Sequence, residues 1–197
     1  MAYQIKQTAE AIQKIKGSKF IGRAYTVYSR EEAQDIVRNI ESEHKKASHV
    51  CWACRIDRNG ESLGYSSDAG EPHGSAGPPI LSVIERYDLT NILCVVIRYF
   101  GGTKLGIGGL IRAYSGVAAE TLAMAGRVKH IPKLQLKITA KPHSYSDVLR
   151  VLRKYCDSVH PSFSPDQISV EFEITSDKFD ELQKDVGQIP TVILTRS

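Results

Sequence analysis

Long hydrophobic runs are missing from this 197-residue sequence. The longest apolar stretch, near Ile92–Ile97, is far too short to cross a bilayer. Residues 1–17 are polar and lack the apolar core of a signal peptide. These absences argue against a membrane or secreted protein, and a hydrophobic content of 42% is typical of globular chains. We therefore expect a cytoplasmic protein.

Cysteine is also scarce, with four residues in the chain. Cys51 and Cys54 form a CxxC pair, which suggests a metal or redox site. However, residues 49–56 read as a strand, and residues three apart on a strand point to opposite faces. Cys94 and Cys156 lack ligand spacing as well. We predict buried free thiols and no confident metal site.

Acidic residues are absent from two windows, residues 11–30 and 89–119. The net charge is +4, and all of this excess falls within residues 1–131, because residues 132–197 carry equal numbers of basic and acidic residues. Two basic stretches within one domain favour a surface for phosphate groups. A solvated lysine face is the ordinary alternative for either stretch taken alone.

The window that follows Asp88 holds the most informative motif. The apolar run Ile92–Ile97 predicts a buried strand. A helical pattern begins at Leu110, with Ile111, Ala118, Leu122 and Ala125 on one face, and Gly126 is placed to end it. Between strand and helix lies a glycine loop with nearby cations: Arg98, Gly101, Gly102, Lys104, Gly106, Gly108, Gly109 and Arg112.

Such a loop predicts an anion site, because glycines allow close backbone approach and free amides at a helix start attract anions. The glycines have a structural alternative, since tight strand–helix packing also requires them. The motif is not a Walker loop, because Leu105 follows Lys104. It is not a dinucleotide fingerprint either, because Gly109 directly follows Gly108.

A second polar loop, Gly64–Pro79, carries Asp68, Glu71 and His73. Two carboxylates and a histidine could hold a divalent cation or act as an acid–base pair. An Asp turn, a Glu salt bridge and an exposed His are the structural alternatives. No cofactor is expected, and a divalent cation is the candidate if the loop binds one.

The elements around these loops follow from their patterns. We predict a strand over Ser18–Tyr28 and a helix over Arg30–His44, with Ser29 and Glu32 as a capping box. In the next strand, His49–Ile56, the face that carries His49 is the less apolar one, so we expect His49 to point away from the core. Pro78 and Pro79 suit the first turn of a further helix that runs to Tyr87.

The last third of the chain reads as a second domain, with a boundary between residues 131 and 132. Its predicted order is strand, helix, strand, strand, helix, strand, which is the ferredoxin-like βαββαβ motif. The ranges are Leu134–Ala140, Ser144–Cys156, Ser158–Phe163, Ile168–Thr175, Asp177–Val186 and Thr191–Thr195. The fold class is α/β (α+β) with two domains.

These motifs together resemble the IMPACT/YigZ family. The resemblance is carried by Ser67–Pro72 with Gly77, Arg98–Gly102, Lys104–Gly106, Gly108–Leu110, Lys19–Ile21 and His49–Cys51. It implies that residues 1–131 share the α/β fold of the second domain of small-subunit ribosomal protein five. It also implies that residues 132–197 resemble the fifth domain of elongation factor G. Bacterial members are regarded as uncharacterised, with RNA or ribosome binding proposed, and eukaryotic relatives regulate translation.

The leading hypothesis is a non-enzymatic protein that binds RNA or the ribosome, with a partner in the translation machinery. Lys19, Arg23, Arg98, Lys104 and Arg112 would contact phosphates. Tyr99 could stack on bases, whereas core packing is the better prediction for Phe100. The alternative is a phosphate-binding enzyme or small-molecule site between the two loops, with His49, Asp68 and Glu71 as metal ligands or general base. No nucleophile–base–orienter set is recognisable. A protein-interaction adaptor is a third possibility.

Overall fold

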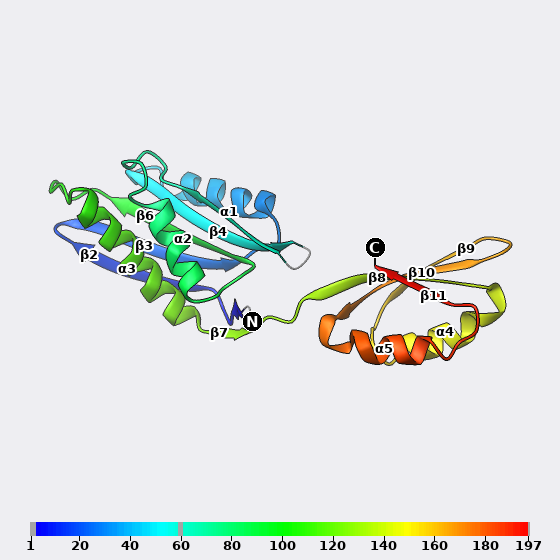
Figure 1. Ribbon diagram of the computed structural model, residues 1–197. Coiled ribbons are helices and arrows are strands. Elements are labelled where there is room, and N and C mark those ends of the chain that lie inside the picture. Colours follow the sequence, from blue (N-terminus) through cyan, green and yellow to red (C-terminus); the bar gives the residue numbers. More distant parts are fainter. Residues whose placement is uncertain (1–2, 59–60, 197) are drawn as a thin grey trace. The chain divides into compact units, whose positions relative to one another are not determined.

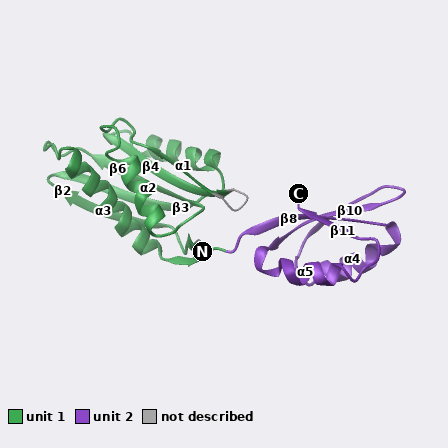
Figure 2. Cartoon of the chain, in the orientation of Figure 1, with its two compact units in different colours: residues 1–130 green, residues 131–197 purple. Residues whose placement is uncertain are grey.

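The computed structural model describes residues 3–58 and 61–196. The chain divides into two compact units, residues 1–130 (unit 1) and 131–197 (unit 2), which Figure 2 colours separately. The sequence placed the boundary one residue later, between residues 131 and 132. Each unit has its own hydrophobic core and is described by itself.

Unit 1 is built on a five-stranded antiparallel sheet with the order β2-β3-β6-β4-β5 (Figure 1). The central strand β6 is the predicted apolar run. The strands are β2 (Ala9–Ile15), β3 (Ser18–Thr26), β4 (His49–Arg58), β5 (Glu61–Ser67) and β6 (Ile92–Tyr99). A separate two-stranded ribbon pairs β1 (Tyr3–Ile5) with β7 (Arg127–Lys129).

Helices cover both faces of this sheet. Helix α1 (Arg30–Glu43) packs on one face, and α2 (Gly77–Arg86) and α3 (Ile107–Ala125) pack on the other (Figure 1). Cys51 faces the α2–α3 side and Cys54 the α1 side, and both are fully buried. The predicted opposite orientation of the two thiols is therefore confirmed. The face of β4 that carries His49 was expected to be the poorer core face, but Cys51 and Ala53 on it are fully buried, so both faces of β4 belong to the core.

The helix boundaries follow recognisable local signals. The Ser29 hydroxyl accepts a hydrogen bond from the Glu32 N–H (3.1 Å), and the Glu32 carboxylate accepts one from the Tyr28 N–H (2.8 Å). This arrangement confirms the N-terminal cap of α1. Helix α3 ends at Gly126, whose φ of 63° is left-handed, as predicted. It begins at Ile107, earlier than the predicted Leu110, and Ile111 is exposed rather than buried.

Strands at the margins of unit 1 were not predicted from the sequence. Strand β5 begins at Glu61 and includes Gly64, where the predicted polar loop was thought to begin. Glycine and serine are poor strand formers, so the segment is held by its pairing with β4 rather than by propensity. Strands β1 and β7 have three residues each, too few to show an alternation of apolar and polar residues.

Unit 2 confirms the predicted βαββαβ order. Its antiparallel sheet has the strand order β11-β8-β10-β9, and α4 and α5 bury one of its faces. Leu136, Ile138, Val170 and Phe172 alternate with polar residues and form that buried face. The elements are β8 (Lys133–Ala140), α4 (Tyr145–Leu152), β9 (Val159–Phe163), β10 (Ile168–Thr175), α5 (Phe179–Val186) and β11 (Ile193–Arg196), with short 3₁₀ turns at Pro142–Ser144 and Ser176–Lys178.

Candidate functional site

One end of the unit 1 sheet brings together four loops that are far apart in sequence. Strand β6 ends there beside the first residues of β3 and β4, because Tyr99 lies opposite Lys19 and Arg98 lies opposite His49. The Phe100 N–H donates to the Ser48 hydroxyl (3.1 Å). The β2–β3 turn, the α1–β4 connection, the loop before α2 and the glycine loop before α3 therefore meet at this end.

The glycine loop, Gly101–Gly109, needs its first glycine for close packing. A Cβ atom on Gly101 would lie 1.9 Å from the carbonyl carbon of Gly17 in the β2–β3 turn. The Gly101 N–H donates to the Ser18 hydroxyl (3.1 Å), which fixes the loop to β3. Gly102 and Gly106 adopt left-handed φ angles of 88° and 69°. The structural explanation for these three glycines therefore holds.

The later glycines lie at the start of a helix. Gly108 and Gly109 belong to the first turn of α3, whose first backbone bond runs from the Leu110 N–H to the Gly106 carbonyl (2.9 Å). The amides before Leu110 therefore precede the helical hydrogen-bond ladder, as amides in every first helical turn do. This position is compatible with an anion at the helix start.

Six cationic side chains surround this end of the sheet, which is called the cationic end from here on. Lys104 and Arg112 belong to the glycine loop and α3, Lys16 to the β2–β3 turn, and the others to β3 and the α1–β4 connection. All but Lys19, which is half-buried, are exposed. Within residues 3–58 and 61–196, none of the six forms an ion pair. The full set is Lys16, Lys19, Lys45, Lys46, Lys104 and Arg112.

Phe100 contradicts its sequence prediction. Core packing was expected, but its side chain is 48% exposed at the start of the glycine loop. Ile107, in the first turn of α3, is 60% exposed. Phe100 follows Tyr99, the last residue of β6, and its ring lies 5.4 Å from the Arg98 guanidinium rather than in a core. The cationic end therefore includes an exposed aromatic ring.

Tyr99 lies differently from its neighbour. It ends β6 on the α1 face, where its ring packs at the edge of the core. Its hydroxyl forms a 2.7 Å hydrogen bond with Nδ1 of His44, at the end of α1. Its expected role in base stacking would require it to leave these contacts.

Arg98 corrects a second expectation, that it contacts phosphates. Its side chain is 6% exposed, and Nη1 lies 2.6 Å from Oε1 of the equally buried Glu71. The Tyr114 hydroxyl of α3 donates to the same carboxylate oxygen (2.7 Å). Burial, with Cys51 and Glu71 nearby, raises the pKa of Tyr114, so this hydroxyl remains a donor. Arg98 and Glu71 therefore anchor the loop before α2 to β6 and α3.

Asp68 holds the same loop together through the backbone. Its carboxylate accepts hydrogen bonds from the N–H groups of Gly74 (2.7 Å), Ala76 (2.9 Å) and Gly77 (2.9 Å). Burial opposes ionisation, but these three bonds and the exposed His73, 3.8 Å away, outweigh it, so the pKa of Asp68 is lowered. Both oxygens are occupied by the loop, as in the Asp-turn alternative.

His49, Asp68 and Glu71 do come together, as the alternative hypothesis requires. His49 Nδ1 lies 2.9 Å from the Ala69 carbonyl, and its Nε2 lies 4.0 Å from Oε2 of Glu71. His49 therefore points toward the α2–α3 side. Still, the part of the chain that the structure describes contains no cluster of three or more His, Cys, Asp or Glu side chains able to hold a metal. The Cys51 thiol nearby donates to the Asp68 carbonyl (3.0 Å), and burial raises its pKa to about 12.

Arg23 lies outside the cationic end. It projects from the middle of β3 and forms ion pairs with Glu10 (2.7 Å) and Glu43 (3.2 Å). These pairs were not predicted from the sequence, because both carboxylates come from outside the acid-free window. Its guanidinium is already neutralised, so Arg23 is a weaker phosphate contact than expected.

A cavity at the cationic end was not predicted from the sequence. It measures about 190 Å³ and lies between the β2–β3 turn and the start of α3. Ile15, Leu105 and Ala113 supply its apolar wall, and Lys16 and Arg112 supply two cations. The only sequence signal was that both cations lie in acid-free windows. Neither this cavity nor the larger one described below is lined by Asp68 or Glu71.

Comparison with known proteins places these features in a family. Residues 16–122 match the family described as the Impact N-terminal domain. IMPACT family member YvyE of Bacillus subtilis is 37% identical over 145 residues, which are 74% of this chain and 64% of that protein. IMPACT family member YigZ of Escherichia coli is 32% identical over 148 residues, which are 74% of this chain and 72% of that protein. The match thus spans less than two thirds of the Bacillus protein.

The fold of the entire chain has a counterpart among solved structures. A crystal structure described as that of a hypothetical protein superposes with a TM-score of 0.81, at 23% identity, over 98% of this chain and 95% of the other. Among the helices that the structure describes, none is long and apolar enough to span a membrane.

Proposed function

This chain belongs to the IMPACT family, and we propose that unit 1 binds RNA, free or within the ribosome, through the cationic end and without catalysis. One observation carries the proposal. Lys16, Lys104 and Arg112 and the three other cations of this end are unpaired within the described residues, whereas the carboxylates beside them are engaged. Unpaired cations gathered around exposed amides are typical of surfaces that contact a phosphate backbone.

The exposed ring of Phe100 favours single-stranded over duplex RNA as the ligand. Proteins hold unpaired bases by stacking them on aromatic side chains, and a duplex hides its bases from such contacts. Phe100 lies directly before Gly101 and within the cationic end, so a strand tracking the cations would pass beside it. We therefore expect single-stranded RNA, or unpaired segments of ribosomal RNA, to bind better than duplex RNA.

The enzyme alternative is the less favoured one, although His49 lies 4.0 Å from Glu71. Asp68 and Glu71 have their carboxylates occupied by loop amides, Arg98 and Tyr114. The proposed likeness of the units to a ribosomal protein domain and to the fifth domain of elongation factor G stays a prediction, as does a role in translation. Ribosome binding in the experiment below would support that role.

The test is a titration of the full chain with single-stranded RNA, duplex RNA and ribosomal subunits at two salt concentrations. Lys104→Ala/Arg112→Ala should weaken binding and lower the salt slope of log K by about 1.4, because two phosphate contacts are lost. The matched control is Lys141→Ala/Arg153→Ala, which removes the same charge from exposed positions of unit 2. Equal losses in both variants would contradict the proposal, as would salt-independent binding.

A further inference from the structure

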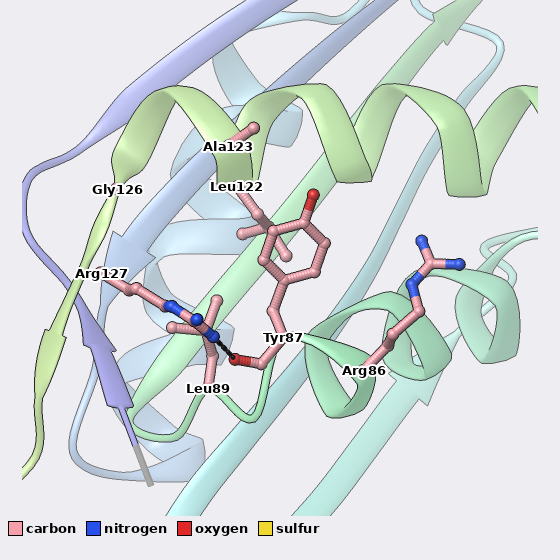
Figure 3. A pocket seen from close by; sticks show the side chains of 7 residues that line it. All are labelled: Arg86, Tyr87, Leu89, Leu122, Ala123, Gly126 and Arg127. Atoms are coloured by element: carbon pink, nitrogen blue, oxygen red, sulfur yellow. Dashed lines mark hydrogen bonds between the residues drawn. The ribbon is translucent and has the colours of Figure 1, made fainter.

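A larger cavity of unit 1 lies at the end of the sheet opposite the cationic end. It measures about 420 Å³ and opens where α2 and α3 both finish, beside the start of β7 (Figure 3). Helix α3 runs the length of the sheet, so its first turn belongs to the cationic end and its last turn to this cavity. The two sites share no lining residue. What binds here is therefore a separate question from RNA binding.

The lining combines an apolar floor with two guanidinium groups. The half-buried Tyr87 ring and the exposed Ala123 form the apolar part, and the buried Leu89 and Leu122 lie beneath them. Figure 3 shows Arg86 and Arg127 on the two sides of that ring. A volume of this size falls within the range of small-molecule pockets, which are mostly apolar with a few placed polar groups. The cavity is thus suited to a molecule with a flat apolar body and an anionic group.

The two arginines are not needed to cap the neighbouring helices. Near the end of α3, the carbonyls of Ala125 and Gly126 accept from Gln7 and Lys6 of the chain before β2, at 3.2 Å each. At the end of α2, the Glu85 and Ile84 carbonyls accept from the next residues of the chain, at 2.9 and 3.1 Å. Arginine near a helix end often serves such carbonyls. Here backbone N–H groups serve these four, and Arg127 reaches only the carbonyl of Tyr87, the C-cap residue of α2.

The guanidinium groups therefore keep most of their donors. Arg127 donates one long bond to the Tyr87 carbonyl (3.5 Å), and its guanidinium lies 4.5 Å from the centre of the Tyr3 ring. Arg86 is exposed and forms no hydrogen bond or ion pair with another residue in the described ranges. A planar guanidinium group matches the geometry of a phosphate, because it can donate two parallel hydrogen bonds to two phosphate oxygens.

We propose that this cavity binds a small molecule in which a planar apolar body carries a phosphate group, the chemical class of the mononucleotides. The planar body lies on the Tyr87 ring. The phosphate is bound by Arg86, and Arg127 flanks the other side of the ring. This site goes beyond RNA binding, because it would hold a free small molecule at the opposite end of the sheet and would need none of the six cations of the cationic end.

The probe is adenosine monophosphate, titrated into the full chain labelled with nitrogen-15, with amide shifts as the readout. Shifts should concentrate on Tyr87, Leu89, Ala123 and Gly126, with a dissociation constant of about 1 mM or lower. Adenosine should bind about tenfold more weakly or worse, because it lacks the charged group. Inorganic phosphate alone should also bind weakly, since it leaves the apolar floor uncovered.

Two variants make the test specific. Arg86→Ala should weaken the adenosine monophosphate shifts by about tenfold and leaves the Arg127–Tyr3 stacking intact. Ala123→Phe places a ring from an exposed helix position into the cavity and should abolish the shifts while both arginines remain. Lys104→Ala/Arg112→Ala should leave these shifts unchanged, which separates this site from the cationic end.

Three outcomes would overturn the proposal. The first is an absence of shifts at these amides with adenosine monophosphate at several millimolar, which would leave Arg86 and Arg127 as solvated surface groups. The second is binding of equal strength for adenosine. The third is binding that persists in folded Ala123→Phe, with the fold judged from the unchanged amide spectrum of the rest of the chain. Failure of RNA binding would not affect any of these results.

Discussion

Two loops meet at the same end of the unit 1 sheet, and they use their polar groups in opposite ways. In the loop before α2, Asp68 and Glu71 are bonded to loop amides, to Arg98 and to Tyr114. In the glycine loop before α3, Lys104 and the nearby Arg112 are exposed, and no residue of the described chain pairs with either. The first loop is closed on itself, and the second is open to a partner.

The comparison shows that a cluster of titratable residues is not by itself a site. The loop before α2 has the richer chemistry in sequence, with two carboxylates and a histidine within residues 68–73. Its carboxylates accept hydrogen bonds from loop amides, from Arg98 and from Tyr114, and these bonds hold β6, α2 and α3 together. The glycine loop offers little chemistry except unpaired charge, which suits binding rather than catalysis. Each prediction below tests one side of this contrast.

The largest expected effect is a loss of stability on breaking the buried ion pair between Arg98 and Glu71, in the loop before α2. Glu71→Ala leaves Arg98 buried without a counter-charge and should destabilise unit 1 by about 4 kcal/mol. Chemical unfolding measured on the full chain would check this, with unit 2 signals as an internal control. Glu71→Gln should cost less, because it keeps a hydrogen-bond acceptor for Tyr114. A loss below about 1 kcal/mol for Glu71→Ala would contradict a structural role for the pair.

A smaller effect, with a distinctive pH dependence, is expected at Asp68. Because the pKa of Asp68 is lowered in the folded state, its stabilisation is present above the unfolded pKa and is lost as the pH falls through the folded pKa. Asp68→Asn should cost about 2 kcal/mol at neutral pH, since three charge-assisted bonds become weaker ones.

The measurement is the free energy of unfolding of both proteins between neutral and strongly acidic pH. The difference between them should shrink as the wild-type carboxylate is protonated. His73→Ala is the matched control, and because His73 is fully exposed it should change stability by less than about 0.5 kcal/mol. A pH-independent difference between wild type and Asp68→Asn would contradict the assigned role.

The smallest of these effects is expected at Phe100, beside the glycine loop. Phe100→Ala should reduce affinity for single-stranded RNA by about fivefold, or about 1 kcal/mol, because one base loses its stacking partner. Stability should change by less than about 0.5 kcal/mol, since the ring is half exposed. Fluorescence anisotropy with single-stranded and duplex RNA measures both affinities. An equal loss for duplex RNA would show that Phe100 does not stack on unpaired bases.

Local signals made much of the fold predictable. The capping residues Ser29 and Glu32, the paired prolines at the start of α2 and the terminal Gly126 act within one helical turn, so the sequence around them is sufficient. Unit 2 was predictable in order because each of its elements carries its own period of apolar residues. Strand β5 was missed because its pairing with β4 overrides a composition rich in Gly and Ser.

The site was less predictable, because its character depends on contacts between distant residues. Arg98 meets Glu71 across 27 positions and Tyr114 meets Glu71 across 43. No local sequence pattern indicates that Arg98, Glu71 and Tyr114 are buried together. Arg98 was therefore predicted to contact phosphates. Likewise, the exposure of Phe100 depends on its place just beyond the end of the buried strand β6. The charge pattern, by contrast, can be counted from the sequence, and the acid-free windows contain Lys104 and Arg112, which the structure shows to be exposed.

The most direct test of the contrast is to map a short single-stranded RNA on the nitrogen-15-labelled full chain by amide shifts. The proposal predicts changes concentrated on the glycine loop and the first turns of α3, from Gly101 to Arg112. The amides of Gly74, Ala76 and Gly77, held by Asp68, should remain in place. Changes confined to those three amides or to unit 2, or no change at all, would contradict the assignment of the glycine loop as the binding surface.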